Sequence, residues 1–364
     1  MENLELVRQR LRNQLVSDSP FSQPDHVVKW MGAIQAQHLA AAIIAIGLRV
    51  ASHSKSTAVD VERAIVDRKI VRTWPMRGTL HFVPAEDLRW MLDLLTPRVI
   101  RNSAGRYRQL ELDEKVFSKI RIVVEKALEK GGQLSRAEIY QVLEENGIAT
   151  TDQRGIHILG YLAQNGVICF GPHRGKQPSF VLLDEWIPDK KILENDAGLA
   201  ILAGRYFKSH GPATVYDFAY WSGLVLAQTK RGIELVKEEL DYRVIKDMTY
   251  FYPEQEVKER PYPDGHPLFL LPAFDEVLCG YKDKTATFGS LDIKSIILKN
   301  GIIQPMIMTK NQTVGTWKQS IKNEHMRIEA YLFQKITALE KEKIEEKAME
   351  LGYFLNKEVA VHFL

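Results

Sequence analysis

Two glutamines two residues apart, in the segment Ile34-Gln35-Ala36-Gln37-His38, are the side chains whose types and spacing point to chemistry. A neutral amide cannot accept a proton as a general base at pH 7, but its carbonyl oxygen can orient a water molecule and stabilise positive charge. Residues i and i+2 of a regular helix lie about 200° apart, so the two amides need a helix end or an irregular turn to act together. The segment lies just before an apolar helix expected to start near His38. Composition alone favours solvated cap or surface residues.

The elements that must position this segment follow a repeated order, in which helices precede two strand-like runs joined by a polar turn. The middle stretch is the clearest. Ser135 with Glu138 predicts a capped helix, and Thr151 or Asp152 caps a second one. Two short strands then flank the basic turn 171–177. Helix, turn, helix and basic hairpin are typical of a winged helix-turn-helix.

The predicted fold class is α+β and mainly helical, with tandem winged helix-turn-helix units forming a concave surface wide enough for a duplex. The length of 364 residues favours two or three domains. The pattern divides the chain into 1–96, which holds the glutamine pair, 97–188, and 189–364, a looser unit with a hairpin and a C-terminal helix and strand. Winged helices bind both DNA and proteins, so this fold does not by itself give the function.

Composition narrows the class of protein. With 45% hydrophobic and 26% charged residues the chain is an ordinary globular protein, not a disordered or fibrous one. A net charge of +3 argues against a histone-like polycation but allows a nucleic-acid binder, because the placement of charge matters more than its sum. Two cysteines and no C-x-x-C or H-E-x-x-H spacing predict neither disulfides nor a metal site. Without a signal peptide or a run of about 20 apolar residues, we expect a cytoplasmic protein with no membrane contact.

Four stretches resemble the bacterial AlkZ/YcaQ-type winged-helix DNA glycosylases. They are residues 34–38 (IQAQH), 72–83 (RTWPMRGTLHFV), 270–284 (LLPAFDEVLCGYKDK) and 300–318 (NGIIQPMIMTKNQTVGTWK). Because they spread over most of the chain, the resemblance covers nearly its whole length, and the Q-x-Q pair stands at the catalytic position of the family. The resemblance implies hydrolysis of the N-glycosidic bond of cationic N-alkylated purines, including bulky adducts and interstrand crosslinks.

Glutamine chemistry fits such a substrate. An N7-alkylated purine is already cationic, so its departure needs little acid assistance, and the enzyme has to orient a water and stabilise an oxocarbenium-like sugar. We expect Gln37 to orient the water and Gln35 to support it, and an exchange of the two roles stays open. Since no lysine lies within the motif to form a Schiff base, a monofunctional glycosylase without metal or cofactor is expected.

Basic segments predict the DNA contacts. No acidic residue lies between Asp93 and Glu111, and the arginines there alternate with small polar side chains, which fits phosphate contacts; a solvated linker between units is the alternative. The basic turn 171–177 and the hairpin turn near residue 310 are further candidates, and the resemblance implies that a hairpin probes the duplex. The predicted DNA-binding residues are Arg98, Arg101, Arg106, Arg108, His173, Arg174, Lys176, Lys310 and Asn311.

Trp30, His38 and Arg77 are candidate substrate contacts. An aromatic face such as that of Trp30 can stack on a base at about 1–3 kcal/mol, with core packing as the alternative. His38 could instead cap a helix, and Arg77 could pair with a buried carboxylate, either Asp275 or Glu276.

A non-enzymatic winged-helix DNA-binding protein, such as a transcriptional regulator, is the alternative function. A regulator is expected to dimerise on symmetric half-sites, and the sequence has no coiled-coil segment. We therefore expect a nucleoid-associated monomer whose partner is double-stranded DNA carrying alkylated bases.

Overall fold

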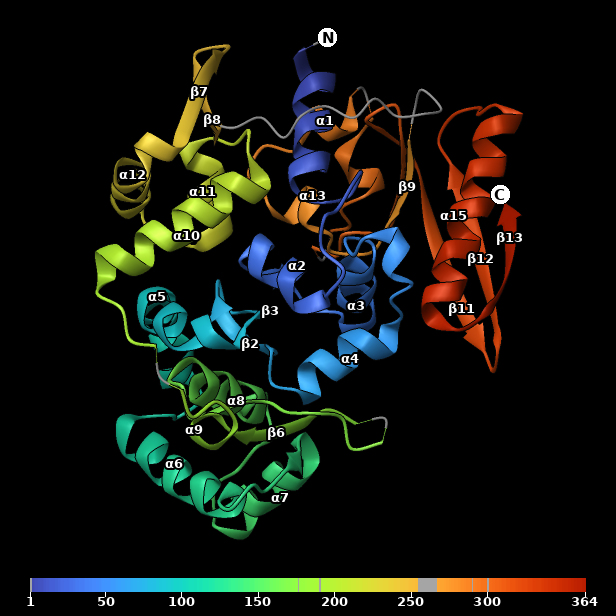
Figure 1. The fold of residues 1–364 in the computed structure, drawn as a ribbon. Coiled ribbons are helices and arrows are strands. Elements are labelled where there is room, and N and C mark those ends of the chain that lie inside the picture. Colours follow the sequence, from blue (N-terminus) through green and yellow to red (C-terminus); the bar gives the residue numbers. More distant parts are fainter. Residues whose placement is uncertain (1, 176, 190, 255–266, 290, 300) are drawn as a thin grey trace. The chain divides into compact units, whose positions relative to one another are not determined.

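The computed structural model describes residues 2–364 except 176, 190, 255–266, 290 and 300. It is 49% helical and 21% strand, which confirms a mixed, mainly helical fold. The chain forms two compact units (Figure 1). Unit 1 comprises Met1–Val61, Ala200–Trp221 and Val225–Leu364, and unit 2 comprises Glu62–Leu199 and Ser222–Leu224. The division into three domains stays a prediction, and its first boundary falls inside one helix, α5.

Unit 2 holds the antiparallel hairpin of β2 and β3, a second, antiparallel sheet and the helices around them. The hairpin of β2 and β3 turns at Arg77 and Gly78, whose φ angles of 56° and 72° fit a two-residue turn of type I′. The second sheet has the order β4-β6-β5. The elements, with α4 entering from unit 1, are α4 (Ala58–Val66), β2 (Ile70–Met76), β3 (Thr79–Pro84), η2 (Ala85–Asp87), α5 (Leu88–Gln109), α6 (Glu114–Leu128), β4 (Leu134–Ser135), α7 (Arg136–Glu145), α8 (Arg154–Gln164), β5 (Ile168–Phe170), β6 (Ser179–Leu182) and α9 (Leu183–Trp186).

The capping predictions in unit 2 have opposite outcomes. Ser135 Oγ accepts from the N–H of Glu138 at 3.3 Å, and Glu138 Oε2 accepts from the N–H of Ser135 at 2.6 Å, which confirms the capping box. The expected cap at Thr151 or Asp152 is wrong, because α8 begins at Arg154 after Gln153. Asp152 and Gln153 have φ of 52° and 70°, whereas a side-chain cap needs extended backbone at the position before the helix.

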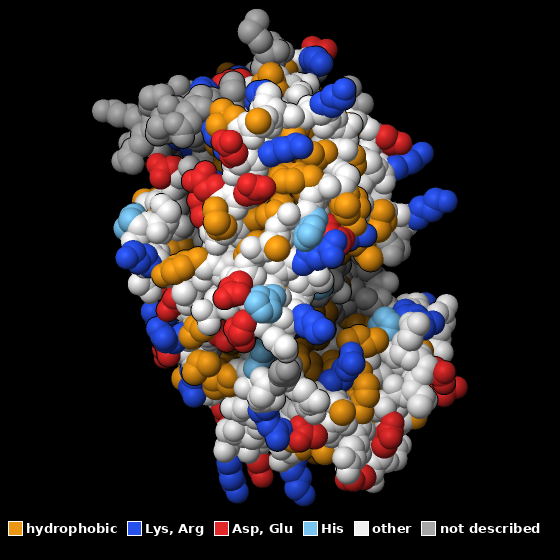
Figure 2. All heavy atoms as spheres, turned by 90° about the vertical axis from the view of Figure 1, so that its right-hand side faces the viewer, with side chains coloured by type: hydrophobic (Ala, Val, Ile, Leu, Met, Phe, Trp, Pro, Cys, Tyr) orange, Lys and Arg blue, Asp and Glu red, His pale blue; other side chains and the backbone are white. Residues whose placement is uncertain are grey.

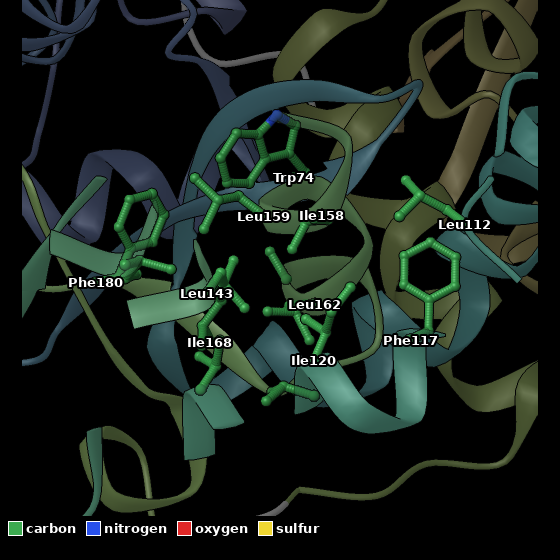
Figure 3. Close-up of a cluster of buried hydrophobic side chains, with 14 of the residues drawn as sticks. Trp74, Leu112, Phe117, Ile120, Leu143, Ile158, Leu159, Leu162, Ile168 and Phe180 are labelled. Atoms are coloured by element: carbon green, nitrogen blue, oxygen red, sulfur yellow. The ribbon is translucent and has the colours of Figure 1, made fainter. Parts of the chain in front are cut away.

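An aromatic cluster closes the core of unit 2. Trp74 on β2 is 8% exposed, and its ring centroid lies 5.3 Å from that of Phe170 and 6.5 Å from that of Phe180. In Figure 3 it lies beside Leu159 of α8 at one side of the cluster. Trp74 therefore packs in the core and joins the hairpin of β2 and β3 to the second sheet.

Unit 1 is built on a five-stranded sheet of order β13-β12-β11-β10-β9, antiparallel except for the parallel pair β12 and β13. Helix α15 lies along one face of it (Figure 1). The strands are β1 (Ile34–Gln35), β7 (Leu240–Ile245), β8 (Met248–Pro253), β9 (Leu268–Leu271), β10 (Met306–Thr309), β11 (Gln312–Lys322), β12 (His325–Leu332) and β13 (Glu358–Phe363). The helices are α1 (Glu2–Asn13), α2 (Pro24–Met31), α3 (Leu39–Gly47), η1 (Ser52–Ser54), α10 (Asn195–His210), α11 (Val215–Ser222), α12 (Leu226–Leu235), η3 (Lys237–Glu239), α13 (Glu276–Cys279), α14 (Thr285–Phe288), η4 (Ile293–Ser295) and α15 (Ala338–Leu355).

The apolar helix expected after the glutamine pair is α3, in which residues 41–46 are buried. A hydrophobic cluster joins α1, through Leu6, Val7 and Leu11, to strands β9 and β10 and to α13. This core fixes the elements that carry the candidate site in unit 1.

The surface of α15 carries charges of both signs. Figure 2 shows basic and acidic side chains interspersed on the face that it presents, and Lys347 of α15 lies 2.7 Å from Glu350. No helix in the described part of the chain is long and apolar enough to cross a membrane.

Candidate active site

The glutamine pair lies on extended backbone, not on a helix. Gln35 ends β1, and Gln37 stands in the bend before α3. Ile34 and Ala36 are 1% and 0% exposed, whereas Gln35 is half-buried and Gln37 is exposed. Because side chains alternate along extended backbone, this burial pattern places both amides on one side and their apolar neighbours on the other. The expected irregular junction before the helix is confirmed.

His38 caps the following helix. Its backbone is extended, and its Nδ1 accepts from the N–H of Ala41 at 3.2 Å, as an N-cap residue does. Trp30 of α2 is half-buried, donates from Nε1 to the carbonyl of Asn13 at 2.7 Å, and has its ring centroid 5.8 Å from that of Phe21. Helix capping accounts for His38 and packing for Trp30, and the contact of either side chain with a substrate stays a prediction.

A buried glutamate lies behind β1. Glu276, the first residue of α13, is 0% exposed, and its Oε1 accepts from the N–H of Gln35 at 2.7 Å. Its Oε2 accepts from Trp221 Nε1 at 3.2 Å. The backbone of the glutamine motif is therefore hydrogen-bonded to a carboxylate 241 positions away in the sequence.

His210 lies next to that carboxylate, with its Nε2 3.5 Å from Glu276 Oε2. Ser209 Oγ donates to the carbonyl of Arg205, so it accepts from His210 Nδ1 at 2.7 Å. Nε2 is buried and has no hydrogen-bond partner. Burial lowers the pKa of His210, and the carboxylate of Glu276 opposes that shift. His210 and Glu276 are thus a buried imidazole and carboxylate in direct contact.

The neighbouring acid, Asp275, has a different partner. Its two oxygens accept from the guanidinium of Arg49 at 2.7 and 2.9 Å, and both side chains are 0% exposed. The suggested pairing of Arg77 with Asp275 is therefore wrong. Adjacent side chains of the turn into α13 diverge, so Asp275 and Glu276 bind different groups.

Arg77 belongs to the hairpin of unit 2. It donates to His81 Nε2 at 3.1 Å, and His81 Nδ1 donates to the carbonyl of Thr79 at 3.0 Å, which fixes the His81 tautomer. On the same hairpin, desolvation lowers the pKa of Arg72 to about 10, and its guanidinium lies 4.6 Å from the ring centroid of Phe170. A substrate contact through Arg77 stays a prediction.

The four arginines of the acid-free segment lie on one helix, α5, inside unit 2, so the alternative of a linker between units is wrong. Arg101 and Arg108 are seven residues apart, which places them about 20° apart around the axis and about 10 Å apart along it. Both are exposed, and neither side chain has a hydrogen bond or ion pair to a described residue. Arg98 donates to the carbonyl of Gly223 at 2.6 Å, and Arg106 to Gln109 and Gln153 at 3.1 Å.

The two predicted basic turns are tied to nearby elements. Arg174 donates to both oxygens of Glu138 at 2.8 and 3.0 Å, His173 is exposed, and Lys176 lies outside the described residues. Between β10 and β11, Lys310 Nζ lies 3.0 Å from Glu340 Oε1, and Asn311 donates to the carbonyl of Leu4 at 3.3 Å.

The β10–β11 hairpin turns where it was predicted to turn. Lys310 and Asn311 have φ of 51° and 60°, so a two-residue turn with positive φ forms without glycine. DNA contact at either basic turn stays a prediction. Among the described residues, no three His, Cys, Asp or Glu side chains are grouped as a metal site requires.

Sequence reasoning missed His210, Trp221 and Arg49 as partners of the acidic pair in the stretch 270–284. The only signal in the sequence was the pair of acids within an otherwise apolar run, where burial demands compensation for each charge.

Comparisons with known proteins agree with this architecture. The interstrand DNA cross-link repair glycosylase of Streptomyces sahachiroi is 26% identical over 333 residues, with 85% of each chain covered. The solved structure of Streptomyces sahachiroi DNA glycosylase AlkZ matches with a TM-score of 0.80 and 20% identity over 99% of each chain, so the fold is the same. The family model described as DNA glycosylase AlkZ-like matches residues 28–354.

The protein is thus a DNA glycosylase, a hydrolase of the bond between a base and its deoxyribose. It belongs to the AlkZ-like DNA glycosylase family, since the family model covers most of the chain. The resemblance seen in the sequence is confirmed.

Proposed function

We propose that the protein excises cationic N-alkylated purines from double-stranded DNA, including bulky adducts and interstrand crosslinks, with Gln35 and Gln37 as catalytic residues. The observation that carries the proposal is the extended segment that places both amides on one side while Ile34 and Ala36 anchor it from the other. The relative named as an interstrand cross-link repair glycosylase supports the substrate class.

The chemistry asked of the two amides is modest. A purine alkylated at N7 carries a positive charge, which the bonding electrons neutralise as the glycosidic bond breaks. The base therefore leaves neutral without a general acid, and the positive charge develops on the sugar. The carbonyl oxygen of the exposed Gln37 orients the attacking water. Gln35 supports that water and adds negative potential near the oxocarbenium-like sugar. A reaction with water and no enzyme amine yields an abasic site without strand cleavage.

DNA binding is assigned to winged-helix units and to the arginine face of α5, defined by Arg98, Arg101 and Arg108. In unit 2 the element order α6-β4-α7-α8-β5-β6 with the sheet order β4-β6-β5 supports one winged helix-turn-helix. The exposed guanidinium groups of Arg101 and Arg108 suit phosphates. We further propose that the winged-helix units occur in tandem and form a concave surface wide enough for a duplex. The protein would act on nucleoid DNA as a monomer.

Base release tests this function directly. The protein is incubated with duplexes carrying N7-methylguanine, a nitrogen-mustard monoadduct or a nitrogen-mustard crosslink, and free base and abasic sites are measured. Release from all three, with no release from undamaged DNA, is expected. No release from any N-alkylated duplex, together with a sequence-specific footprint, would instead identify a regulator.

The arginine face gives a quantitative prediction on DNA affinity. Each phosphate contact contributes about 0.9 to the slope of log K against log salt concentration, so Arg101→Ala with Arg108→Ala should make that slope shallower by about 1.8. Fluorescence anisotropy with an undamaged duplex at several salt concentrations measures it. Arg121→Ala on α6, an exposed arginine that pairs with Glu125, is the control and should leave the slope unchanged. An unchanged slope in the double variant removes this face from the interface.

A further inference from the structure

The stretch 270–284 carries a buried carboxylate with no role in the chemistry proposed so far. Burying an ionised carboxylate is costly unless hydrogen bonds and charges compensate it. Glu276 is 0% exposed, yet its carboxylate accepts from the backbone N–H of Gln35 in β1 at 2.7 Å. A fold that needed only a filled core would use an apolar residue here.

The carboxylate is itself held by rigid partners. Trp221 Nε1 donates to Oε2, and His210 lies on the same oxygen at 3.5 Å. The backbone carbonyl of Glu276 accepts from Gln14 Nε2 at 3.3 Å, and Gln14 also donates to the hydroxyl of Tyr281 at 2.8 Å. These contacts attach α13 to α10, to α11 and to the segment directly after α1, and they leave the carboxylate little freedom.

Close packing around α13 supports the same conclusion. A Cβ at Gly280 would lie 2.5 Å from His210 Cδ2 and 2.7 Å from the carbonyl of Glu276, so glycine is required where the helix meets the imidazole. Asp275 pairs with Arg49, which lies two residues after the end of α3. The segment that contains Gln35 and Gln37 is thus tied at its start by Glu276, and the helix after it ends beside the Asp275 pair.

We infer that Glu276 is a positioning residue for the glutamine motif: its carboxylate oxygen fixes the backbone of Gln35 and so sets the direction of the two amides. This inference rests on the proposed role of Gln35 and Gln37. Glu276 is fully buried and acts on the motif through its hydrogen bond to the backbone of Gln35. A displacement of about 1 Å at reacting groups can lower a rate about 100-fold, so loss of this bond reduces the chemical step.

Two opposite variants separate positioning from charge. Glu276→Gln keeps the side-chain length and an oxygen for the N–H of Gln35, while its amide nitrogen replaces the oxygen that faces His210 and Trp221, so that Trp221 loses its acceptor. Glu276→Asp keeps the charge but withdraws the oxygens by about 1.5 Å. The experiment measures the single-turnover rate of N7-methylguanine release, the affinity for the same duplex and the unfolding midpoint. Val277→Ala, a truncation of the next buried residue on α13, is the control for lost stability.

Positioning predicts that Glu276→Gln retains a rate within about 5-fold of the unchanged protein, while Glu276→Asp loses about 100-fold in rate with DNA affinity within about 3-fold. Val277→Ala, assayed well below its unfolding midpoint, keeps its rate. The inference is overturned if Glu276→Asp is active and Glu276→Gln is not. It is also overturned if both variants keep the unchanged rate that is expected of Val277→Ala. Should Gln37→Ala retain full activity, the proposed function fails, whereas an inactive Gln37→Ala beside a fully active Glu276→Asp refutes the positioning role alone.

Discussion

Gln37→Ala is expected to lower the single-turnover rate of N7-methylguanine release by about 10²–10³-fold, the loss typical for removal of one preorganised polar group that acts in the transition state. The side chain is exposed at the bend before α3, so its truncation leaves the core intact. DNA affinity should change little because phosphate contacts supply most of it. Quench-flow or manual single-turnover assays of released base, with the unfolding midpoint measured in parallel, test this expectation.

Gln35→Ala tests the companion amide under the same assay. The smaller loss is expected here if Gln35 supports a water that Gln37 orients, and the reverse order of the two losses would exchange the roles. Gln141→Ala on α7, which removes an amide bonded to Glu145 in unit 2, is the matched control and should keep full activity. If both motif variants retain activity within about 3-fold, the catalytic assignment is wrong, because a preorganised group contributes far more than that.

Asp275→Ala is expected to destabilise the protein by about 3–5 kcal/mol, the usual consequence of leaving one member of a buried ion pair without its partner. Arg49 uses all five N–H groups, since it donates to Asp275, to both the carbonyl and the amide oxygen of Gln14, and to the carbonyl of Ala45. Removal of the carboxylate leaves a fully buried guanidinium charge with two donors unsatisfied. Urea unfolding followed by circular dichroism measures the free energy and the m-value.

Two comparisons make this result specific. Glu125→Ala breaks the exposed pair with Arg121 on α6 and should leave the unfolding midpoint unchanged. Replacement of both Asp275 and Arg49 by apolar residues should destabilise less than Asp275→Ala alone, because no buried charge then stays uncompensated. A loss below about 1 kcal/mol for Asp275→Ala would mean that water or another group reaches Arg49.

Local features of the fold followed from the sequence. The Ser135 capping box, the apolar helix α3 and the two-residue turn at Lys310 and Asn311 all depend on groups a few positions apart, so their patterns are visible in a short window. The alternative of a linker between units for the arginine segment is wrong, because the segment forms part of α5 inside unit 2.

The sequence by itself determined which side chains are candidates: the Q-x-Q pair, the acid-free arginine segment and two adjacent acids in an apolar run. Only the tertiary structure decided how they are used. Extended backbone at β1 turned a spacing unsuited to a helix into one that presents both glutamines on the same side. Asp275 binds Arg49, which is 226 positions away in the sequence, and Glu276 binds the backbone of Gln35, which is 241 positions away. Any acid can compensate any base or N–H, so such partners are chosen by three-dimensional proximity, which no local pattern encodes.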